Sequence, residues 1–509
     1  LSSSSAASDV YKRQIKNRAK LWTKNENTNR IRGRCSDNSC VLSKRDIPFS
    51  CIDEDLYNHP PTLLIATVDK FTRFASEPRA RVLLGVGQDI NISPPDLVIQ
   101  DELHLLTGPL GSLAGLYESA IEVLWKRSGA RIKYVAATAT IRGAEKNTKI
   151  MYGRELNVFP PPGLSIKDNF FSEERDDVDG RAHISLLGNY LNSRSILNKP
   201  LANIIQAAKG LVDNYPNKIK EIDPYWTSIV YFNSLRELSG ARSAMEDTII
   251  DPGYIKDYSV LNNNNGPRAI KSLEELFSRK KSEELKVTLT KLSNPIGHEG
   301  CLDVCFTTNM FQVGVDVDRL GLMIINGQPK SNSEYIQASG RVGRNLKSPG
   351  LVVSILRSTK PRDISHYEMH RSFHQEIYKH VDVTTTTPFS PNAFSRALPS
   401  VIMLLLRQGL HKCGGNEEIK NLGEKYIQNK AKLFIDDLIS LVNERIEDSA
   451  LRSVIEKDIQ SVWRDLQRFA EGAEQGNRPS YWRRNSINKK PAWGKGSYVN
   501  NKSNDEKEI

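Results

Sequence analysis

Two carboxylates and a histidine follow a short apolar run early in the chain, in the sequence Asp96-Leu97-Val98-Ile99-Gln100-Asp101-Glu102-Leu103-His104. Such a run is typical of a buried strand in a parallel sheet, and open α/β sheets bind ligands at the carboxyl ends of these strands. We therefore interpret Asp101 as a residue that holds Mg²⁺ through its water shell, as the Walker-B aspartate of nucleotide hydrolases does. Glu102 would polarise the attacking water, and His104 would sense the γ-phosphate or the next motif. The tetrapeptide taken alone favours a simpler interpretation, a strand followed by a solvated acidic turn.

Two arginines three residues apart occur in Gln337-Ala338-Ser339-Gly340-Arg341-Val342-Gly343-Arg344. Residues with this spacing on a helix share one face, so the sequence predicts that Arg341 and Arg344 reach into one cleft. Guanidinium groups suit multidentate phosphate contact, and ATP hydrolysis at a domain interface needs cations that meet the γ-phosphate when the interface closes. Paired arginines alone are a weak signal, because many surface helices contain them.

Three further blocks stand in order around these two: Ile132–Thr140, an apolar run ending in Thr-Ala-Thr, then Ser228–Leu235 and Cys305–Val317. Together the five blocks resemble motifs II to VI of superfamily-two helicases of the DEAD/DEAH type. The resemblance implies ATP and Mg²⁺ as cofactors. It also assigns further residues: coupling to nucleic acid would involve Thr138, Thr140, Thr308 and Asn309, and nucleotide contact would involve Gly314, Asp316, Gln337 and Gly340.

Four more blocks narrow the resemblance: Thr62–Phe71, Leu103–Gly111, Asn326–Lys330 and Val383–Pro391. With them the chain, over about residues 30 to 470, resembles the large helicase subunit of DISARM-type bacterial anti-phage systems. This implies an ATP-dependent helicase or translocase with nucleic acid, preferably DNA, as its track and a second subunit as its partner. Related DNA-repair helicases share many of these blocks. A non-catalytic nucleic-acid-binding scaffold subunit is the alternative from another functional class.

The sequence contains no GxxxxGK[ST] phosphate loop, the helicase motif I whose amides and lysine hold the nucleotide phosphates. It opens with residues 1–14 that look like a non-native sequencing-adaptor scar and are excluded from fold reasoning. We therefore expect a C-terminal fragment of a longer helicase, lacking motif I and inactive as an ATPase on its own. A natural pseudo-helicase without motif I is the competing interpretation.

Bulk composition agrees with a nucleic-acid partner. The net charge is +11 and the pI about 9.1, which favours a polyanion. No apolar run approaches the length of a membrane span, and six cysteines in 509 residues do not make a disulfide framework, so we expect a cytoplasmic protein. Cys35 and Cys40 on a polar loop could supply half of a zinc site in the intact parent, although a closed structural site needs four ligands.

The predicted fold class is α/β, with two RecA-like parallel-sheet domains, the first truncated, followed by a helical C-terminal region. The expected segments follow in chain order, and the last of them is predicted to be a disordered basic tail. They are a scar at 1–14, the remnant of a Cys-containing insertion at 15–60, a partial first domain at 61–165, a linker or insertion at 166–225, the second domain at 226–360, a helical region at 361–475 and the tail at 476–509.

Overall fold

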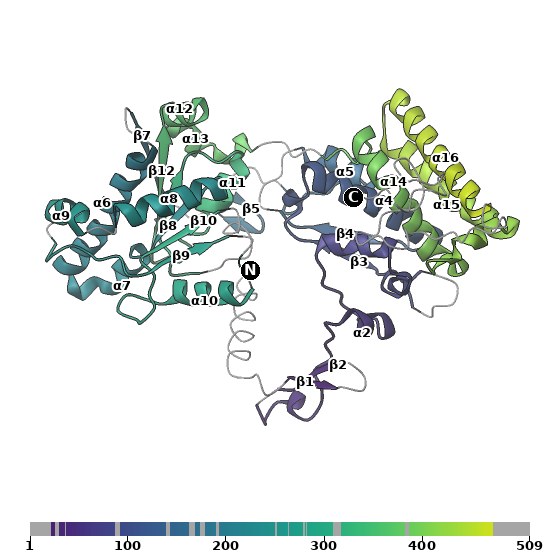
Figure 1. The fold of residues 1–509 in the computed structure, drawn as a ribbon, viewed down its shortest axis with the longest axis horizontal. Coiled ribbons are helices and arrows are strands. Elements are labelled where there is room, and N and C mark those ends of the chain that lie inside the picture. Colours follow the sequence, from purple (N-terminus) through teal and green to yellow (C-terminus); the bar gives the residue numbers. More distant parts are fainter. Residues whose placement is uncertain are drawn as a thin grey trace, which may run out of the picture. The chain divides into compact units, whose positions relative to one another are not determined.

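The computed structural model describes residues 22–25, 30–35, 37–86, 92–138, 143–161, 168–173, 179–189, 193–249, 252–262, 264–277, 280, 282–308, 317–381 and 386–471. The chain divides into two compact units (Figure 1). Unit 1 comprises residues 1–138, 143–157 and 384–509, and unit 2 comprises 139–142 and 158–383. Each unit has its own buried core.

Among the described residues, unit 2 contains a sheet of six strands, all parallel, in the order β7-β12-β11-β8-β10-β9. Its inner strands form because near-continuous apolar runs suit a sheet that is covered on both faces. Ile229 and Tyr231 lie in one core cluster, whereas Val230 and Phe232, which point the other way, lie in a second. The strands are β7 (Arg181–Gly188), β8 (Ser228–Phe232), β9 (Leu273–Leu276), β10 (Val304–Thr307), β11 (Leu322–Asn326) and β12 (Gly350–Arg357).

Helices cover both faces of this sheet (Figure 1). The cluster of Val230 and Phe232 includes Leu201 of α6 and Leu238 of α8, and the opposite cluster includes Tyr335 of α11. Unit 2 also contains a short antiparallel pair, β5 (Asp168–Asn169) and β6 (Ser172–Glu173). Its helices are α6 (Ser193–Asn214), α7 (Ile219–Ile222), α8 (Leu235–Asp247), α9 (Pro252–Leu261), α10 (Ser282–Ser293), α11 (Asn332–Ser339), α12 (Pro361–Glu368) and α13 (His370–Gln375).

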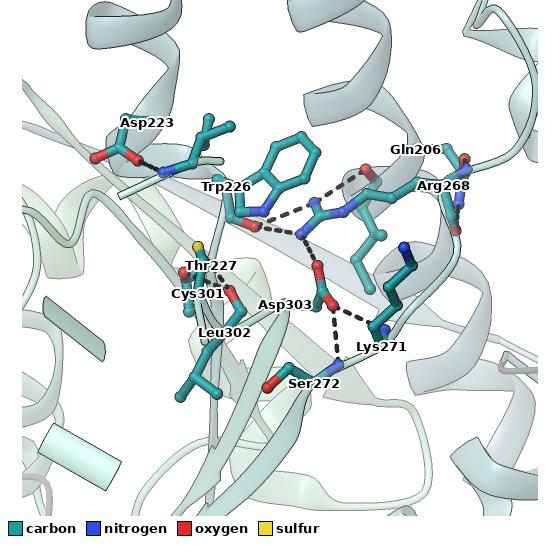
Figure 2. Close-up of polar contacts among 12 residues, drawn as sticks. Gln206, Asp223, Trp226, Thr227, Arg268, Lys271, Ser272, Cys301, Leu302 and Asp303 are labelled. Atoms are coloured by element: carbon teal, nitrogen blue, oxygen red, sulfur yellow. Dashed lines mark hydrogen bonds and ion pairs between the residues drawn. The ribbon is translucent and has the colours of Figure 1, made fainter. Parts of the chain in front are cut away.

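A buried ion pair connects the residues that directly precede three of the strands (Figure 2). Arg268 donates to Asp303 over 2.6 Å, and its guanidinium carbon lies 3.5 Å from the ring centroid of Trp226. The other carboxylate oxygen of Asp303 accepts the backbone N–H groups of Lys271 and Ser272 at 2.9 and 3.0 Å. These contacts fix the residues that lead into β8, β9 and β10 relative to one another.

Unit 1 is built on a smaller parallel pair, β3 (Leu97–Gln100) and β4 (Lys133–Ala136), joined through helix α4 (Gly108–Arg127). Val98 and Tyr134 pack on the core of the unit, but the outward-facing Leu97 and Ile99 are 47% and 64% exposed. The predicted parallel strand is therefore present, whereas its predicted burial is wrong. Successive strand residues point to opposite faces, and among the described residues the face of Leu97 and Ile99 is left open.

Helices from the end of the chain complete the core of unit 1. They are α14 (Pro391–Gly409), α15 (Lys425–Arg445) and α16 (Ser449–Glu471), and they pack with α4 and α5 (Ala144–Tyr152) around a single cluster. The run Val401–Leu406 is buried inside α14, as expected of a core helix. The predicted fold class, a parallel-sheet α/β protein with a mostly helical C-terminal region, is confirmed. The other elements of unit 1 are β1 (Trp22–Asn25), β2 (Arg30–Gly33), α2 (Asp53–Asn58) and α3 (Arg81–Leu84).

The observed division differs from the predicted segments in several places, two of which concern described helices and strands. The segment 166–225, expected as a linker, contributes β7 and α6 to unit 2, so the sheet begins well before residue 226. Part of the predicted helical region belongs to unit 2 through α12 and α13, and the rest, from residue 384, belongs to unit 1. The predicted scar at 1–14 and tail at 476–509 lie outside the described residues.

Candidate active site

The acidic residues lie in a tight turn at the carboxyl end of β3, which we call the DELH turn (Asp101–His104). Glu102 has φ 53° and ψ 45° and is the one residue other than glycine with positive φ in the described part of the chain. This left-handed conformation costs a non-glycine residue roughly 1–2 kcal/mol. The Asp101 carboxylate accepts the Glu102 N–H at 2.9 Å, which stabilises the turn. Unusual backbone conformations of this kind concentrate at functional sites.

The residue that follows β4 is hydrogen-bonded to the chain on both sides of Asp101 and Glu102. Ala137 donates to the carbonyl of Gln100 at 2.8 Å and accepts from Leu103 at 3.0 Å, so the two chains stay paired beyond their strands. The buried His104 places Nδ1 3.0 Å from Thr138 Oγ1 and 3.5 Å from a Glu102 carboxylate oxygen. Asp101, Glu102, His104 and Thr138 are thus brought together within unit 1.

A polar network lies beneath the same strand. Gln100, the last residue of β3, donates to Glu118 of α4 at 3.0 Å and accepts from the Tyr152 hydroxyl. Glu118 is buried, and this burial raises its pKa to about 7, with the positive charge of Arg445 opposing the shift. Arg445 of α15 donates to Ser119 at 2.9 Å and to the carbonyl of Met151, and burial lowers its pKa to about 10. The network therefore connects the carboxylate strand to the C-terminal helices.

The two arginines lie in unit 2, in the segment Gly340–Arg344 that we call the arginine loop. The prediction that they share one helix face is wrong, because α11 ends at Ser339 and both arginines follow it. Gly343 has φ +64° and its N–H donates to Leu320 at 2.8 Å; a side chain there would collide with Gly350 at 2.4 Å. Because Gly343 has no side chain, the loop can turn here in close contact with Gly350. Arg344 is exposed and its Nε donates to the carbonyl of Gly340 at 3.2 Å.

Some of the remaining predicted site residues lie within the described part of the chain, and others lie outside it. Gln337 is half-buried on α11, and Gly340 follows the last residue of that helix, so both stand beside the arginines in sequence and in the fold. Thr308 is buried directly after β10, with its N–H donating to Leu276 at 3.4 Å. Four other predicted site residues lie outside the described residues: Thr140, Asn309, Gly314 and Asp316.

No group of three or more His, Cys, Asp or Glu side chains that could hold a metal is found in the described part of the chain. Within it, the proposed half zinc site of Cys35 and Cys40 therefore gains no further ligands. The described residues also contain no helix that is long and apolar enough to cross a membrane.

One structurally important residue at the carboxyl ends of the unit 2 strands escaped sequence reasoning. The buried Asp363 of α12 accepts the N–H of Gln328 at 3.1 Å and that of Arg357 at 3.0 Å. Asn233 donates to the carbonyls of Gly327 and Gln328 at 3.2 and 3.3 Å, so the ends of β8, β11 and β12 are joined. The available signal was an aspartate in the first turn of a helix that starts with proline, at Pro361-Arg362-Asp363.

Comparison with known proteins agrees with these motifs. A family model described as the helicase conserved C-terminal domain matches residues 258–346, which include the arginine loop. The chain is 35% identical over 505 residues to the DISARM protein DrmA of Bacillus paralicheniformis, covering 88% of this chain and 45% of that protein. It is 24% identical over 297 residues to the ATP-dependent helicase Lhr-Core of Methanocaldococcus jannaschii, covering 58% of this chain and 28% of that protein.

Among solved structures, the helicase Lhr of Mycobacterium smegmatis bound to single-stranded DNA and AMP-PNP is 14% identical with a TM-score of 0.48, covering 79% of this chain and 42% of that one. The chain spans less than half the length of the curated relatives it matches. The predicted resemblance to superfamily-two helicases and to a DISARM protein is confirmed.

Proposed function

We propose that this chain, a helicase-family protein related to DISARM protein DrmA and to Lhr-Core, forms the motor part of an ATP-dependent nucleic-acid helicase or translocase. The observation that carries the proposal is the DELH turn. Glu102 is held in a left-handed conformation at the carboxyl end of a parallel strand, and His104 of the same turn contacts Thr138. A solvated acidic turn would need neither the strained backbone nor the contact with the second strand.

The proposed roles follow from the chemistry of each group. The Asp101 carboxylate is a hard oxygen ligand on an exposed residue, which fits Mg²⁺ bound through water. Glu102, with its side chain 44% exposed, orients the attacking water. Bound Mg·ATP supplies the phosphoryl group whose hydrolysis drives movement. Arg341 and Arg344 stabilise the charge on the γ-phosphate, and His104 with Thr138 passes the state of the nucleotide site to the nucleic-acid side.

The track is nucleic acid gripped through its phosphates, with DNA as the preferred form. A net charge of +11 favours such a polyanion. The similarity to a DISARM protein supports a place in anti-phage defence, with a partner subunit and a cytoplasmic location. Coupling would also involve Thr140, Thr308 and Asn309, and nucleotide contact Gly314, Asp316, Gln337 and Gly340.

The test is DNA-stimulated ATP hydrolysis by the longer helicase of which we propose this chain to be part, because these 509 residues include no GxxxxGK[ST] loop. Glu102→Gln should leave nucleotide binding nearly unchanged and reduce turnover severely, since the magnesium contact belongs to Asp101. The matched control is Glu145→Gln, which makes the same charge change at an exposed residue of α5. Turnover of the Glu102→Gln protein near that of the control would refute the proposed role of the turn.

A second variant tests the arginine loop. Removing an arginine that stabilises a transferring phosphate costs about 10³–10⁵ in rate. Arg344→Ala should therefore collapse turnover while the dissociation constant for DNA stays within about threefold. Normal turnover with weaker DNA binding and a salt slope lowered by about one would instead place Arg344 on the nucleic-acid track. If the parent protein itself shows no DNA-stimulated hydrolysis, the alternative of a non-catalytic scaffold subunit is favoured.

A further inference from the structure

A third arginine, Arg181, reaches the arginine loop from outside the segment matched by the helicase family model. It is the first residue of β7, the strand at one edge of the six-stranded sheet. Its Nε donates to the carbonyl of Val342 at 2.7 Å and its Nη2 donates to the carbonyl of Gly340 at 3.3 Å. These two carbonyls flank Arg341 in the sequence, so one guanidinium fixes the backbone on both sides of that residue.

The carbonyl of Gly340 also accepts a hydrogen bond from a second arginine. Arg344 donates its Nε to Gly340 at 3.2 Å, so Arg181 and Arg344 share one acceptor. The path of the Arg181 side chain depends on Gly350 at the start of β12, where an added Cβ would lie 2.8 Å from Arg181 Cγ. Partial burial lowers the pKa of Arg181, and the charge of Arg344 acts in the same direction against that of Tyr378. The two guanidinium groups are therefore close enough to repel each other electrostatically.

Strand β7 is also attached to the helix that precedes the arginine loop. His183 Nδ1 lies 2.9 Å from the hydroxyl of Tyr335, a buried residue of α11, and the same hydroxyl lies 2.9 Å from His374 Nε2. The parallel pairing of β7 with β12 runs over the full length of both strands. Arg181 thus acts from a strand that is itself fixed to the sheet and to α11, and its hold on the loop is correspondingly rigid.

We propose that Arg181 is a positioning residue for the arginine pair: by holding the carbonyls of Gly340 and Val342 it sets the direction in which Arg341 and Arg344 point. This inference rests on the proposed function, since it assigns Arg181 to the same hydrolytic site. Arg181 is proposed to act through the loop backbone, because two of its five N–H donors bind the carbonyls that flank Arg341. A small displacement of a group that acts on a transition state can cost about 10²-fold in rate, so the effect on turnover is large.

The experiment compares Arg181→Gln, Arg181→Lys and Arg242→Gln in the full-length protein. Arg242 is the matched control, because it lies in the same unit and pairs with Glu246 and Glu275 at 3.0 Å, away from the loop. Arg181→Gln should lower kcat by about 10- to 100-fold with the ATP KM and the DNA dissociation constant within about threefold. Arg181→Lys should recover part of that loss, since one ammonium keeps the charge and one of the two contacts. Arg242→Gln should match the parent.

A transition-state analogue separates positioning from simple loss of stability. The affinity for ADP with aluminium fluoride should fall about 10-fold or more in Arg181→Gln while the affinity for ADP stays unchanged. Equal losses for both ligands, or a fall in kcat that only follows a lower unfolding midpoint of unit 2, would overturn the proposal. If Arg344→Ala and Glu102→Gln abolish turnover but Arg181→Gln does not, the positioning role fails alone. If all three hydrolyse ATP normally, the proposed function fails with it.

Discussion

Replacing Asp303 by asparagine is expected to destabilise unit 2 more than any exposed charge change in it. The Asp303 carboxylate accepts from the Arg268 guanidinium at 2.6 Å and from the N–H groups of Lys271 and Ser272. All of these partners are donors. An asparagine has the same shape but one of its two ends is an NH₂ donor. In either orientation of the amide, a donor would therefore face a donor in a buried place (Figure 2).

The magnitude follows from the burial of the pair. The Arg268 and Asp303 side chains are 3% and 10% exposed, so removing the negative charge leaves the guanidinium buried beside a neutral group. Breaking a buried ion pair on one side costs about 3–5 kcal/mol. Three neutral contacts remain for the arginine, two to the carbonyl of Trp226 at 3.1 Å and one to the carbonyl of Ile205 at 3.5 Å. They keep the expected loss within that range rather than above it.

Urea unfolding of this chain, followed by tryptophan fluorescence, measures the loss. Trp226 is the one tryptophan in the sequence between residues 158 and 383, so the part of the emission change that is absent from a Trp226→Phe background reports on unit 2. With a slope of about 2 kcal/mol per M, the midpoint should fall by about 1.5–2.5 M. The control Glu246→Gln removes an exposed partner of Arg242 and should cost less than about 1 kcal/mol. A loss below about 1 kcal/mol for Asp303→Asn would refute the argument from donor conflict.

Three further outcomes are expected in the same chain. Thr138→Val should destabilise unit 1 by about 1–3 kcal/mol in urea unfolding, because it removes the Oγ1 partner of the buried His104; Thr138→Ser, which keeps the hydroxyl, should not. Glu102→Gly should stabilise unit 1 by about 1 kcal/mol, since glycine tolerates φ 53°, whereas Glu102→Ala should not. Burial raises the pKa of Glu118 to about 7, above its unfolded value, so stability falls as the pH rises from about 4.5 through 7. Glu118→Gln should flatten this dependence in thermal unfolding at pH 5–8 and be the more stable protein at pH 8; an unchanged slope would contradict the assignment.

The strands of unit 2 with apolar runs were predictable and those with mixed composition were not. The apolar runs at 228–233, 302–307, 320–325 and 350–356 are typical of buried strands, and each contains a strand. Arg181–Gly188 escaped prediction because it lies at the edge of the sheet, where one side of the strand is solvated and residues such as Arg181, His183 and Ser185 are tolerated. Because this edge is solvated, the side chain of Arg181 can extend from β7 to the arginine loop.

The geometry of the arginine pair could not be read from its spacing. Three residues on a helix place two side chains on one face, and the pattern up to Ser339 is helical. The helix nevertheless ends there, and the chain turns at Gly343, which adopts positive φ and packs against Gly350 on β12. The path of the chain through the two arginines therefore depends on a long-range contact. Residue types alone do not contain it.

The geometry of the DELH turn also depends on contacts between residues that are far apart in the sequence. Its four residues were identified from sequence, but the strained conformation of Glu102 exists only because the chain at Ala137 and Thr138 fixes both ends of the turn. The contact between His104 and Thr138 joins positions 34 residues apart, so motif II has this geometry only where motif III is paired beside it. We therefore expect a change at Thr138 to act on the backbone that presents Glu102, so that under the proposed function any effect on hydrolysis follows from the position of that carboxylate.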